Sequence, residues 1–167
     1  MSDISNQLNK CAALNPEVIN NSAVYALLSV KYSQARESDI NIQFEVFLNP
    51  ITIDTDDLLL IRMLGILLDN AIDAAKHSPE KLMSIRLRDD SNTHKRLLII
   101  ENTYSNKDVD EGAIFDKGVS SKQKANGKSR GLGLWQVRNI LEKNMDKFNL
   151  QTTKDEKFFK QQFEIFY

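Results

Sequence analysis

The stretch that decides the fold is "GILLDNAIDAAKH", residues 65–77. It lies in a predicted helix that is apolar almost all round, so we expect that helix to be buried. Asn70, Asp73 and His77 nevertheless fall at positions i, i+3 and i+7 on one face, with Asp69 beside them. Since buried polar groups need partners, either this face is an exposed edge or Asn70 and Asp73 line a pocket. In a pocket, a carboxamide oxygen suits a Mg²⁺ held otherwise by waters and substrate phosphates.

A second informative stretch is "GKSRGLGLWQVR", residues 127–138, at the end of a basic run that starts at Lys117. It is not a P-loop, because the place five residues before Gly127 is Lys122, and it is not a dinucleotide turn, because the third small residue is replaced by Gln136. Gly131 and Gly133 allow backbone N–H groups to approach an anion at the start of a helix predicted over 132–145. Close packing of that helix is the alternative explanation for the two glycines.

The remaining periodicity predicts an α/β (α+β) two-layer sandwich, with a mixed or antiparallel sheet backed by about three helices. The two further helices are predicted at 17–37 and from a cap at Asp54 or Thr55 to Ala75. Strands are predicted at 41–48 and 50–53, in "KLMSIRLRDD" and "THKRLLIIEN", and in a closing hairpin over 148–167 that turns near 154–157. The polar segment 103–130 has only "GAIF" as an apolar island, and loops of that length are usually functional.

Composition limits the classes of protein to which the chain can belong. With 167 residues, 41% hydrophobic and 27% charged, the chain is predicted to form one globular domain. Its formal net charge of -1 gives no support for nucleic-acid or membrane-surface binding. The single Cys11 excludes an internal disulfide, and only His77 and His94 offer imidazole ligands for a metal. The cysteine count fits a reducing cytosolic setting. No apolar run approaches the roughly 18 residues that span a bilayer, so we expect no direct membrane contact for this chain, whether it stands alone or is cut from a larger membrane protein.

Three of these segments together resemble the GHKL (Bergerat) ATP-binding fold, and within it the catalytic domain of sensor histidine kinases. "LLDNAIDAA" resembles the N-box, "IFDKGVSSK" the F-box region of the ATP lid, and "GKSRGLGL" the G2 box after the lid. Histidine kinases usually carry an Asp-x-Gly-x-Gly turn after the central strand. Here that place reads "IIENTYSN", with Asn102 at the Asp position and no glycine. This loss is similar to the Agr-type kinases that sense peptide pheromones in quorum sensing.

The resemblance implies that residues 16–167 form the catalytic domain, with its lid at 103–130, and that residues 1–15 lead in from an upstream helical domain. It implies Mg²⁺ binding by Asn70, a pocket wall at Asp73, adenine contact at Asn102 and anchoring of the lid by Phe115. It also implies phosphate binding by the backbone of Gly131, Leu132, Gly133 and Leu134, and charge neutralisation by Lys122 and Arg130.

Transfer to protein is expected rather than hydrolysis. ATP-hydrolysing relatives carry a glutamate four residues before the Mg²⁺-binding asparagine, and Ile66 holds that place here. The implied activity is transfer of the ATP γ-phosphoryl group to a histidine on the kinase's own dimerisation domain, and then to a response regulator, in the cytoplasmic part of a membrane receptor. His77 and His94 are interpreted as a helix-end and a surface histidine. Two alternatives stay open: an anti-sigma-type protein-serine kinase, and a non-catalytic nucleotide-binding or docking module.

Overall fold

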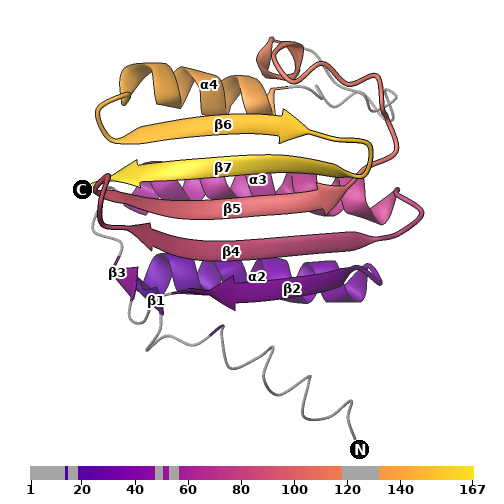
Figure 1. Cartoon of the computed structure of the whole chain (residues 1–167), viewed down its shortest axis with the longest axis horizontal. Coiled ribbons are helices and arrows are strands. Elements are labelled where there is room, and N and C mark those ends of the chain that lie inside the picture. Colours follow the sequence, from indigo (N-terminus) through magenta and orange to yellow (C-terminus); the bar gives the residue numbers. More distant parts are fainter. Residues whose placement is uncertain (1–13, 15–18, 48–50, 53–56, 118–131) are drawn as a thin grey trace, which may run out of the picture.

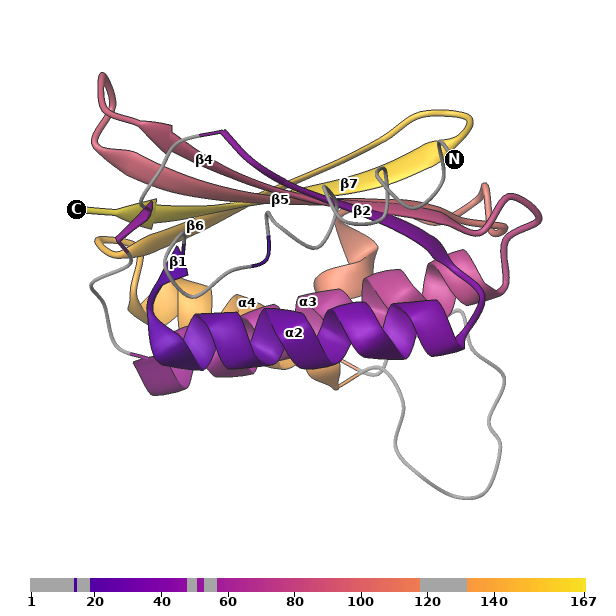
Figure 2. The ribbon, with the colours of Figure 1, turned by 90° about the horizontal axis from the view of Figure 1, so that it is seen from below.

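The protein forms a five-stranded mixed β-sheet covered on one face by three helices, in a computed structural model that describes residues 14, 19–47, 51–52, 57–117 and 132–167. The sheet order is β2-β4-β5-β7-β6. Its strands are β2 (Asn41–Val46), β4 (Leu82–Asp90), β5 (Lys95–Thr103), β6 (Phe148–Lys154) and β7 (Phe158–Phe166). The helices are α2 (Ser22–Glu37), α3 (Asp57–Lys76) and α4 (Gly133–Lys143), and Figure 1 and Figure 2 show all three on the same side of the sheet.

The sheet is mixed because β2 pairs parallel with β4 while the other neighbouring pairs are antiparallel. The two-layer α/β sandwich predicted from the sequence is therefore confirmed. Both predicted hairpins form, joined by the turn before Lys95 and by the turn that contains Asp155. Along β5, Leu98 and Ile100 belong to the core under the helices, so Asn102 of the same alternate row faces the helix layer.

The first helix begins later than its periodicity indicates. The sequence predicted a start at Glu17, but α2 begins at Ser22 because the side chain of Asn21 accepts a hydrogen bond from the amide of Val24 at 2.9 Å. Ile19 instead forms a two-residue strand, β1 (Ile19–Asn20), parallel to β3 (Ile51–Thr52). This start at Glu17 is the prediction that the structure contradicts.

The other boundaries agree with the predictions to within a few residues. Helix α3 ends at Lys76, just before Ser78 and Pro79 as expected, while the predicted caps Asp54 and Thr55 lie outside the described residues. The "GAIF" island contains a short 3-10 helix, η1 (Ala113–Phe115).

The core lies between the sheet and the helices, and it is closed by large side chains with no solvent exposure. Leu28 of α2, Leu64 and Leu67 of α3, Val137 of α4 and Phe163 of β7 are all completely buried. Burial of each such side chain contributes about 1.5–3 kcal/mol, so the core holds α3 firmly on the sheet.

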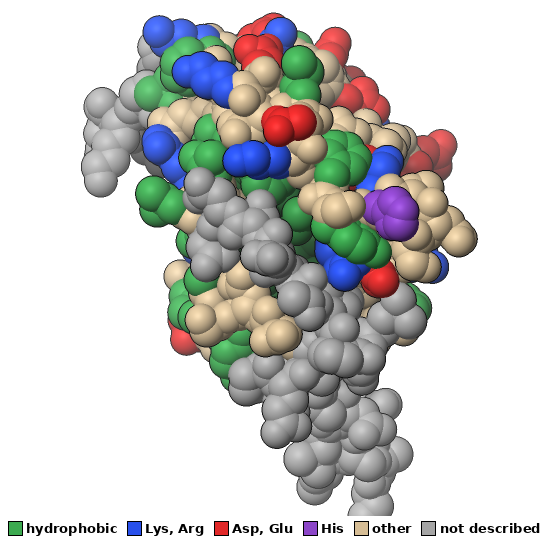
Figure 3. Space-filling view, turned by 90° about the vertical axis from the view of Figure 1, so that its left-hand side faces the viewer, with side chains coloured by type: hydrophobic (Ala, Val, Ile, Leu, Met, Phe, Trp, Pro, Cys, Tyr) green, Lys and Arg blue, Asp and Glu red, His purple; other side chains and the backbone are tan. Residues whose placement is uncertain are grey.

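Among the described residues, none of the helices has the length and hydropathy needed to cross a bilayer. On the end of the molecule shown in Figure 3, Lys and Arg side chains are interspersed with Asp and Glu, and the described part of that face has no extended patch of one sign. This mixture agrees with the near-neutral net charge.

Candidate functional site

The polar face predicted on α3 belongs to a longer row of side chains. The row consists of Arg62, Ile66, Asn70, Asp73 and His77. An α-helix turns by about 100° per residue, so side chains at these spacings lie within about 80° of the helix circumference. Asn70 and Asp73 are half-buried, whereas Asp69 is exposed and bonds to Lys31 of α2 at 2.6 Å, away from the row.

Helix α4 contacts the first half of this row, and its first residue, Gly133, lies beside Ile66. A Cβ added to Gly133 would lie 3.1 Å from Cγ2 of Ile66, and the guanidinium of Arg62 donates to Oε1 of Gln136 at 3.2 Å. Because contacts advance along α4 as they go back along α3, the two helices run antiparallel. The N-terminus of α4 therefore points towards Asn70, one turn or about 6 Å further along α3 than Ile66.

The start of α4 has the features of an anion site. Its N-cap residue is Leu132, which offers no side-chain hydrogen bond, and the carbonyl of Leu132 accepts the amide of Gln136 at 2.9 Å. The first amides of a helix have no partner within the helix, and its N-terminus carries a partial positive charge. Among the residues described here, none in the first turn is acidic, so nothing on the helix itself opposes an anion.

Asn102 approaches the same region from the sheet. It lies near the end of β5, only 2% exposed, and its Nδ2 donates to the backbone oxygen of Thr103 at 2.9 Å. Its neighbours across the sheet are Met83 on β4 and Phe159 on β7. The Asn102 carboxamide thus lies between two apolar side chains on the helix-facing side of the sheet, and Gln161, 4% exposed, is the next residue of that row on β7.

A buried pair of hydroxyl groups joins the end of α3 to the end of β5. The Oγ of Ser78 lies 2.5 Å from Oγ1 of Thr103 and donates to the carbonyl of Ala75 at 2.8 Å. The amide of Leu82 donates to Oγ1 of Thr103 at 3.0 Å. This Ser78–Thr103 junction fixes the helix that carries Asn70 relative to the strand that carries Asn102, and the sequence analysis missed it, because hydroxyl residues 25 positions apart have no local pattern.

The segment after β5 is attached to the β6–β7 hairpin. Tyr104 is buried, which raises the pKa of its phenol, and its hydroxyl donates to the backbone oxygen of Asp155 at 2.5 Å. Lys154 donates to the carbonyls of Lys107 and Val109. The amides of Phe158 and Lys157 hold the pKa of Asp155 below its usual range, so this turn keeps its charge near neutral pH.

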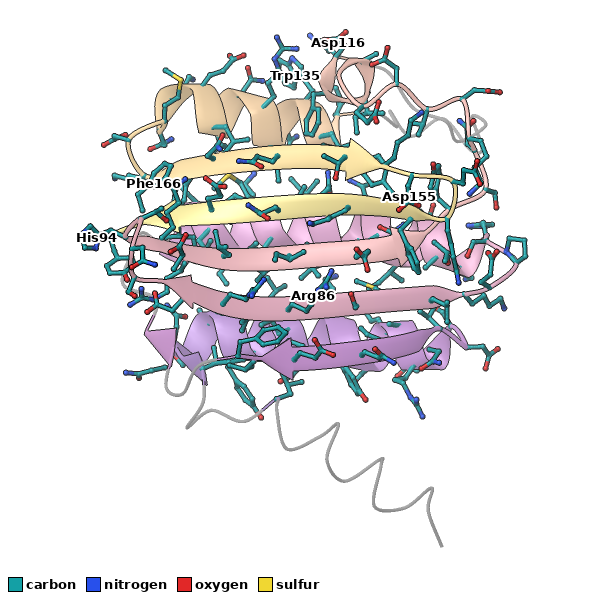
Figure 4. All side chains as sticks on the ribbon, in the orientation of Figure 1. Arg86, His94, Asp116, Trp135, Asp155 and Phe166 are labelled. Carbon is teal, nitrogen blue, oxygen red and sulfur yellow. The ribbon has the colours of Figure 1, made fainter. Side chains whose placement is uncertain are left out.

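The residues that precede position 118 pack beside α4. Asp116 accepts a hydrogen bond from Arg138 of α4 at 2.8 Å, and the Lys117 ammonium lies 5.2 Å from the centre of the Trp135 ring. Figure 4 shows Asp116 and Trp135 side by side there. Phe115 of η1 is half-buried, and η1 packs against α4.

The structure describes most, but not all, of the predicted site residues. Lys122, Arg130 and Gly131 lie outside the described residues. Asn70 and Asp73 on α3, Leu132, Gly133 and Leu134 at the start of α4, and Asn102 on β5 are all on the helix side of the sheet. No cluster of three His, Cys, Asp or Glu residues that could hold a metal ion occurs in the described ranges.

The two histidines occupy the positions predicted for them. His77 follows α3, is exposed, and its Nδ1 lies 2.7 Å from the backbone oxygen of Asp73. His94 lies in the β4–β5 turn with a φ of 52°, against the ring of Tyr167. Among the described residues, neither histidine forms a hydrogen bond, ion pair or ring contact with the start of α4.

A hollow of about 180 Å³ lies on the opposite, open face of the sheet and is separate from this site. Its lining includes Ser84, Arg86 and Glu101, and Figure 4 shows Arg86 in the middle of that face. The sheet separates this hollow from α3. We place the functional site on the helix side instead, because the polar row and the start of α4 meet there.

Comparison with known proteins shows the family and the fold. The family model described as GHKL domain matches residues 56–166, and none of the curated proteins matches the chain. Among solved structures, the nucleotide-free catalytic domain of the histidine kinase ThkA is 22% identical with a TM-score of 0.67, covering 87% of this chain and 90% of that one.

Two further solved structures are similar at lower identity. The Acinetobacter baumannii histidine kinase AdeS is 17% identical with a TM-score of 0.64, covering 97% of this chain and 77% of its own. Full-length ShkA, solved in complex with AMPPNP, is 18% identical with a TM-score of 0.65, covering 86% of this chain and 29% of its own. At these identities the likeness shows the fold.

Proposed function

The chain belongs to the GHKL domain family, and from that premise we propose that it is the ATP-binding catalytic domain of a sensor histidine kinase. The observation that carries the proposal is the antiparallel approach of α4 to α3. It directs the N-terminus of α4, whose N-cap residue Leu132 makes no side-chain hydrogen bond, towards Asn70. A helix N-terminus is suited to phosphate, and a carboxamide oxygen is suited to Mg²⁺.

We assign to each residue the role that the resemblance implies. The backbone N–H groups of Gly131 to Leu134 bind the phosphates, and Lys122 and Arg130 neutralise their charge. Asn70 is the protein ligand of Mg²⁺, which, when bound with ATP, screens the phosphate charge and orients the γ-phosphoryl group. Asp73, one turn beyond Asn70, accepts hydrogen bonds at the pocket wall.

Asn102 and the segment after β5 complete the nucleotide site. Asn102 contacts the adenine amino group, and Phe115 holds the segment 103–130 against α4 as a lid over the nucleotide. A neutral amide gives a weaker hydrogen bond than a carboxylate. We therefore expect Mg-ATP to bind more weakly than low-micromolar.

Ile66 favours transfer to a protein over hydrolysis. An isoleucine neither accepts a proton nor orients water, and its Cγ2 faces Gly133. The acceptor is an imidazole on a separate dimerisation domain: its nitrogen forms the P–N bond, the bond from the γ-phosphorus to the bridging oxygen breaks, ADP leaves, and the ring loses its proton to solvent. The phosphoryl group then passes to a response regulator.

The altered turn at Asn102, without glycines after it, supports a place in the Agr-type branch and a role in peptide quorum sensing. The same alteration is the observation that favours the second candidate, a nucleotide-binding docking module without catalysis. An anti-sigma-type serine kinase is distinguished by its product, because phosphoserine is stable in acid and phosphohistidine is not.

The test compares Asn70→Ala with Asp69→Ala. These residues are adjacent, but Asp69 is exposed and bonds to Lys31 outside the row, so it is the matched control. Mg-ATP binding is measured by calorimetry, and transfer is measured with radiolabelled ATP and an added histidine-bearing dimerisation domain, followed by acid treatment of the product.

We expect Asn70→Ala to abolish Mg-dependent binding and transfer, Asp69→Ala to retain both, and the wild-type product to be acid-labile. Equal activity of the two variants would remove Asn70 from the site. Binding without transfer would favour the docking module.

A further inference from the structure

We propose that Lys154 positions the start of α4 by anchoring the segment 104–117, which we call the strap. The inference rests on the proposed function, because the start of α4 is the proposed phosphate site. It adds to that function a positioning residue that lies outside the site, at the end of β6.

Helix α4 has few side chains in the core, so its position depends on contacts at its surface. Of its residues Gly133–Lys143, only Val137 is buried. An element with few buried apolar contacts has a low local stability. Helix α3, by contrast, contributes five large side chains without solvent exposure, which are Leu60, Met63, Leu64, Leu67 and Leu68. We therefore expect contacts near the start of α4 to decide where its first amides lie.

The end of the strap provides such contacts in the first two turns of α4. Asp116 accepts a hydrogen bond from Arg138 at 2.8 Å, and the Lys117 ammonium lies 5.2 Å from the centre of the Trp135 ring. The 3-10 helix η1, which belongs to the strap, also packs against α4. Displacement of the strap would therefore remove support from the N-terminal half of α4.

Lys154 fixes the other half of the strap to the sheet. Its ammonium donates to the backbone oxygen of Lys107 at 3.2 Å and to the backbone oxygen of Val109. Hydrogen bonds from a charged donor are roughly twice as strong as those between neutral groups. Because Lys154 is the last residue of β6, these two bonds join the strap to the edge strand of the sheet.

Between the two attachments, Asp110 holds the strap in a defined shape. Its Oδ1 accepts hydrogen bonds from the amides of Ala113 at 2.9 Å and Gly112 at 2.8 Å, where η1 begins. These amides hold the pKa of Asp110 below its usual range, and the nearby Lys154 ammonium lowers it further. Loss of the ammonium would therefore weaken both the anchor and the turn that leads into η1.

A second anchor limits the size of the effect. The hydroxyl of Tyr104 donates to the backbone oxygen of Asp155 at 2.5 Å, and Lys107 donates to the backbone oxygen of Tyr104 at 2.8 Å. These bonds hold the beginning of the strap without help from Lys154. Loss of Lys154 should therefore loosen the strap without detaching it, and nucleotide affinity should fall only in part.

Three variants of the full chain separate the positioning role from the effect of charge. Lys154→Met keeps an unbranched apolar stem and removes the ammonium, whereas Lys154→Arg keeps a cationic donor. Lys157→Met is the matched control, because Lys157 has the same charge and lies in the same turn. Its ammonium lies 5.2 Å from the centre of the Phe158 ring and is not bonded to the strap.

Trp135 reports on the end of the strap, because it is the only tryptophan in the chain and the Lys117 ammonium lies over its ring. Without nucleotide, acrylamide should quench its fluorescence more strongly in Lys154→Met than in the wild type. Quenching in Lys154→Arg and Lys157→Met should equal that of the wild type. A purely structural role for Lys154 would lower the melting temperature but leave the quenching of the folded protein unchanged.

Mg-ATP affinity is then measured by calorimetry on the same proteins, with circular dichroism to show that each is folded. Lys154→Met is expected to bind about fivefold more weakly than the wild type, a typical size for coupling between separated residues. Lys154→Arg and Lys157→Met are expected to bind like the wild type.

Unchanged quenching in Lys154→Met overturns the inference, as does an equal loss of affinity in Lys157→Met. Stronger quenching with unchanged Mg-ATP affinity shows that the strap does not position the phosphate site, and it overturns the inference while the proposed function stands. If the wild type does not bind Mg-ATP, the proposed function itself fails, and the quenching still decides whether Lys154 positions α4.

Discussion

Gly133→Ala tests the contact between α3 and α4 beside Asn70. The added Cβ would lie 3.1 Å from Cγ2 of Ile66, whereas carbon atoms in good contact are about 3.5–4.0 Å apart. One helix must therefore shift by about 0.4 Å or more at the place where α4 begins. The shift changes the position of the first amides of α4 relative to Asn70.

The expected cost combines two opposing effects. Alanine in a helix gains about 0.5–1 kcal/mol over glycine, and overpacking a well-packed contact costs about 1–3 kcal/mol. The free energy of unfolding should therefore fall by about 1 kcal/mol. Gly65→Ala is the matched control in α3, because its Cβ would meet only Cδ1 of Leu27 at 4.0 Å, so that variant should be about 0.5–1 kcal/mol more stable.

Substitutions of Ile66 identify the atom responsible. Leucine has no methyl on Cβ at the Cγ2 position, so Ile66→Leu should relieve the clash in the double variant, whereas Ile66→Val keeps the branch at Cβ with a methyl group at the Cγ2 position and should not. Urea unfolding followed by circular dichroism gives the coupling energy, expected at about 1 kcal/mol for leucine and near zero for valine. Equal rescue by the two residues, or stabilisation by Gly133→Ala alone, would refute the packing argument.

Two further predictions concern the rest of the domain. Burial of Glu164 would by itself raise the pKa of its carboxyl group, but hydrogen bonds from Lys95, Gln162 and Asn149 hold it below its usual range. The stability that Glu164 contributes is therefore present above its unfolded pKa near 4.5 and is lost as the pH falls through the lower folded value. Glu164→Gln should lower the free energy of unfolding by about 2 kcal/mol at pH 7 and should reduce the loss of stability on acidification. The melting temperature measured as a function of pH checks this, and an unchanged pH dependence would contradict it. Phe163→Ala, at a fully buried position, should cost about 3–5 kcal/mol in urea unfolding, while Val30→Ala, 53% exposed, should change stability by less than about 0.5 kcal/mol.

The sequence predicts the centre of this fold well because local patterns determine it. Helix α3 is long and apolar and ends at Lys76, where Ser78 and Pro79 stop it as expected. Strands β4 and β5 alternate and are joined by a short turn, so their pairing follows from adjacency along the chain. The polar row on α3 is also readable in advance, since helical spacing alone places Asn70 and Asp73 on one face.

What the sequence does not predict depends on partners far away in the chain. Ile19 fits the apolar spacing of the helix that follows, but it pairs with Ile51, and the Asn21 side chain starts α2 instead. The Ser78–Thr103 junction likewise joins residues from two different elements. Patterns along the chain identify elements and faces, whereas the contacts that align one element with another are visible only in the folded protein.

The position at which α4 starts decides which residues of α3 it contacts. Arg62 and Ile66 of the row contact α4, while Asn70 and Asp73 lie further along α3 than its first residue. If α4 began one turn earlier, its added residues would extend about 5.4 Å towards Asn70 and cover it. Gly133 is the first residue of α4, and having no side chain it permits the close approach to Ile66. Glycine also has a low helix propensity, so it disfavours extension of α4 to an earlier start. The same residue thus sets how tightly the two helices pack and how much of the polar row is left for a ligand.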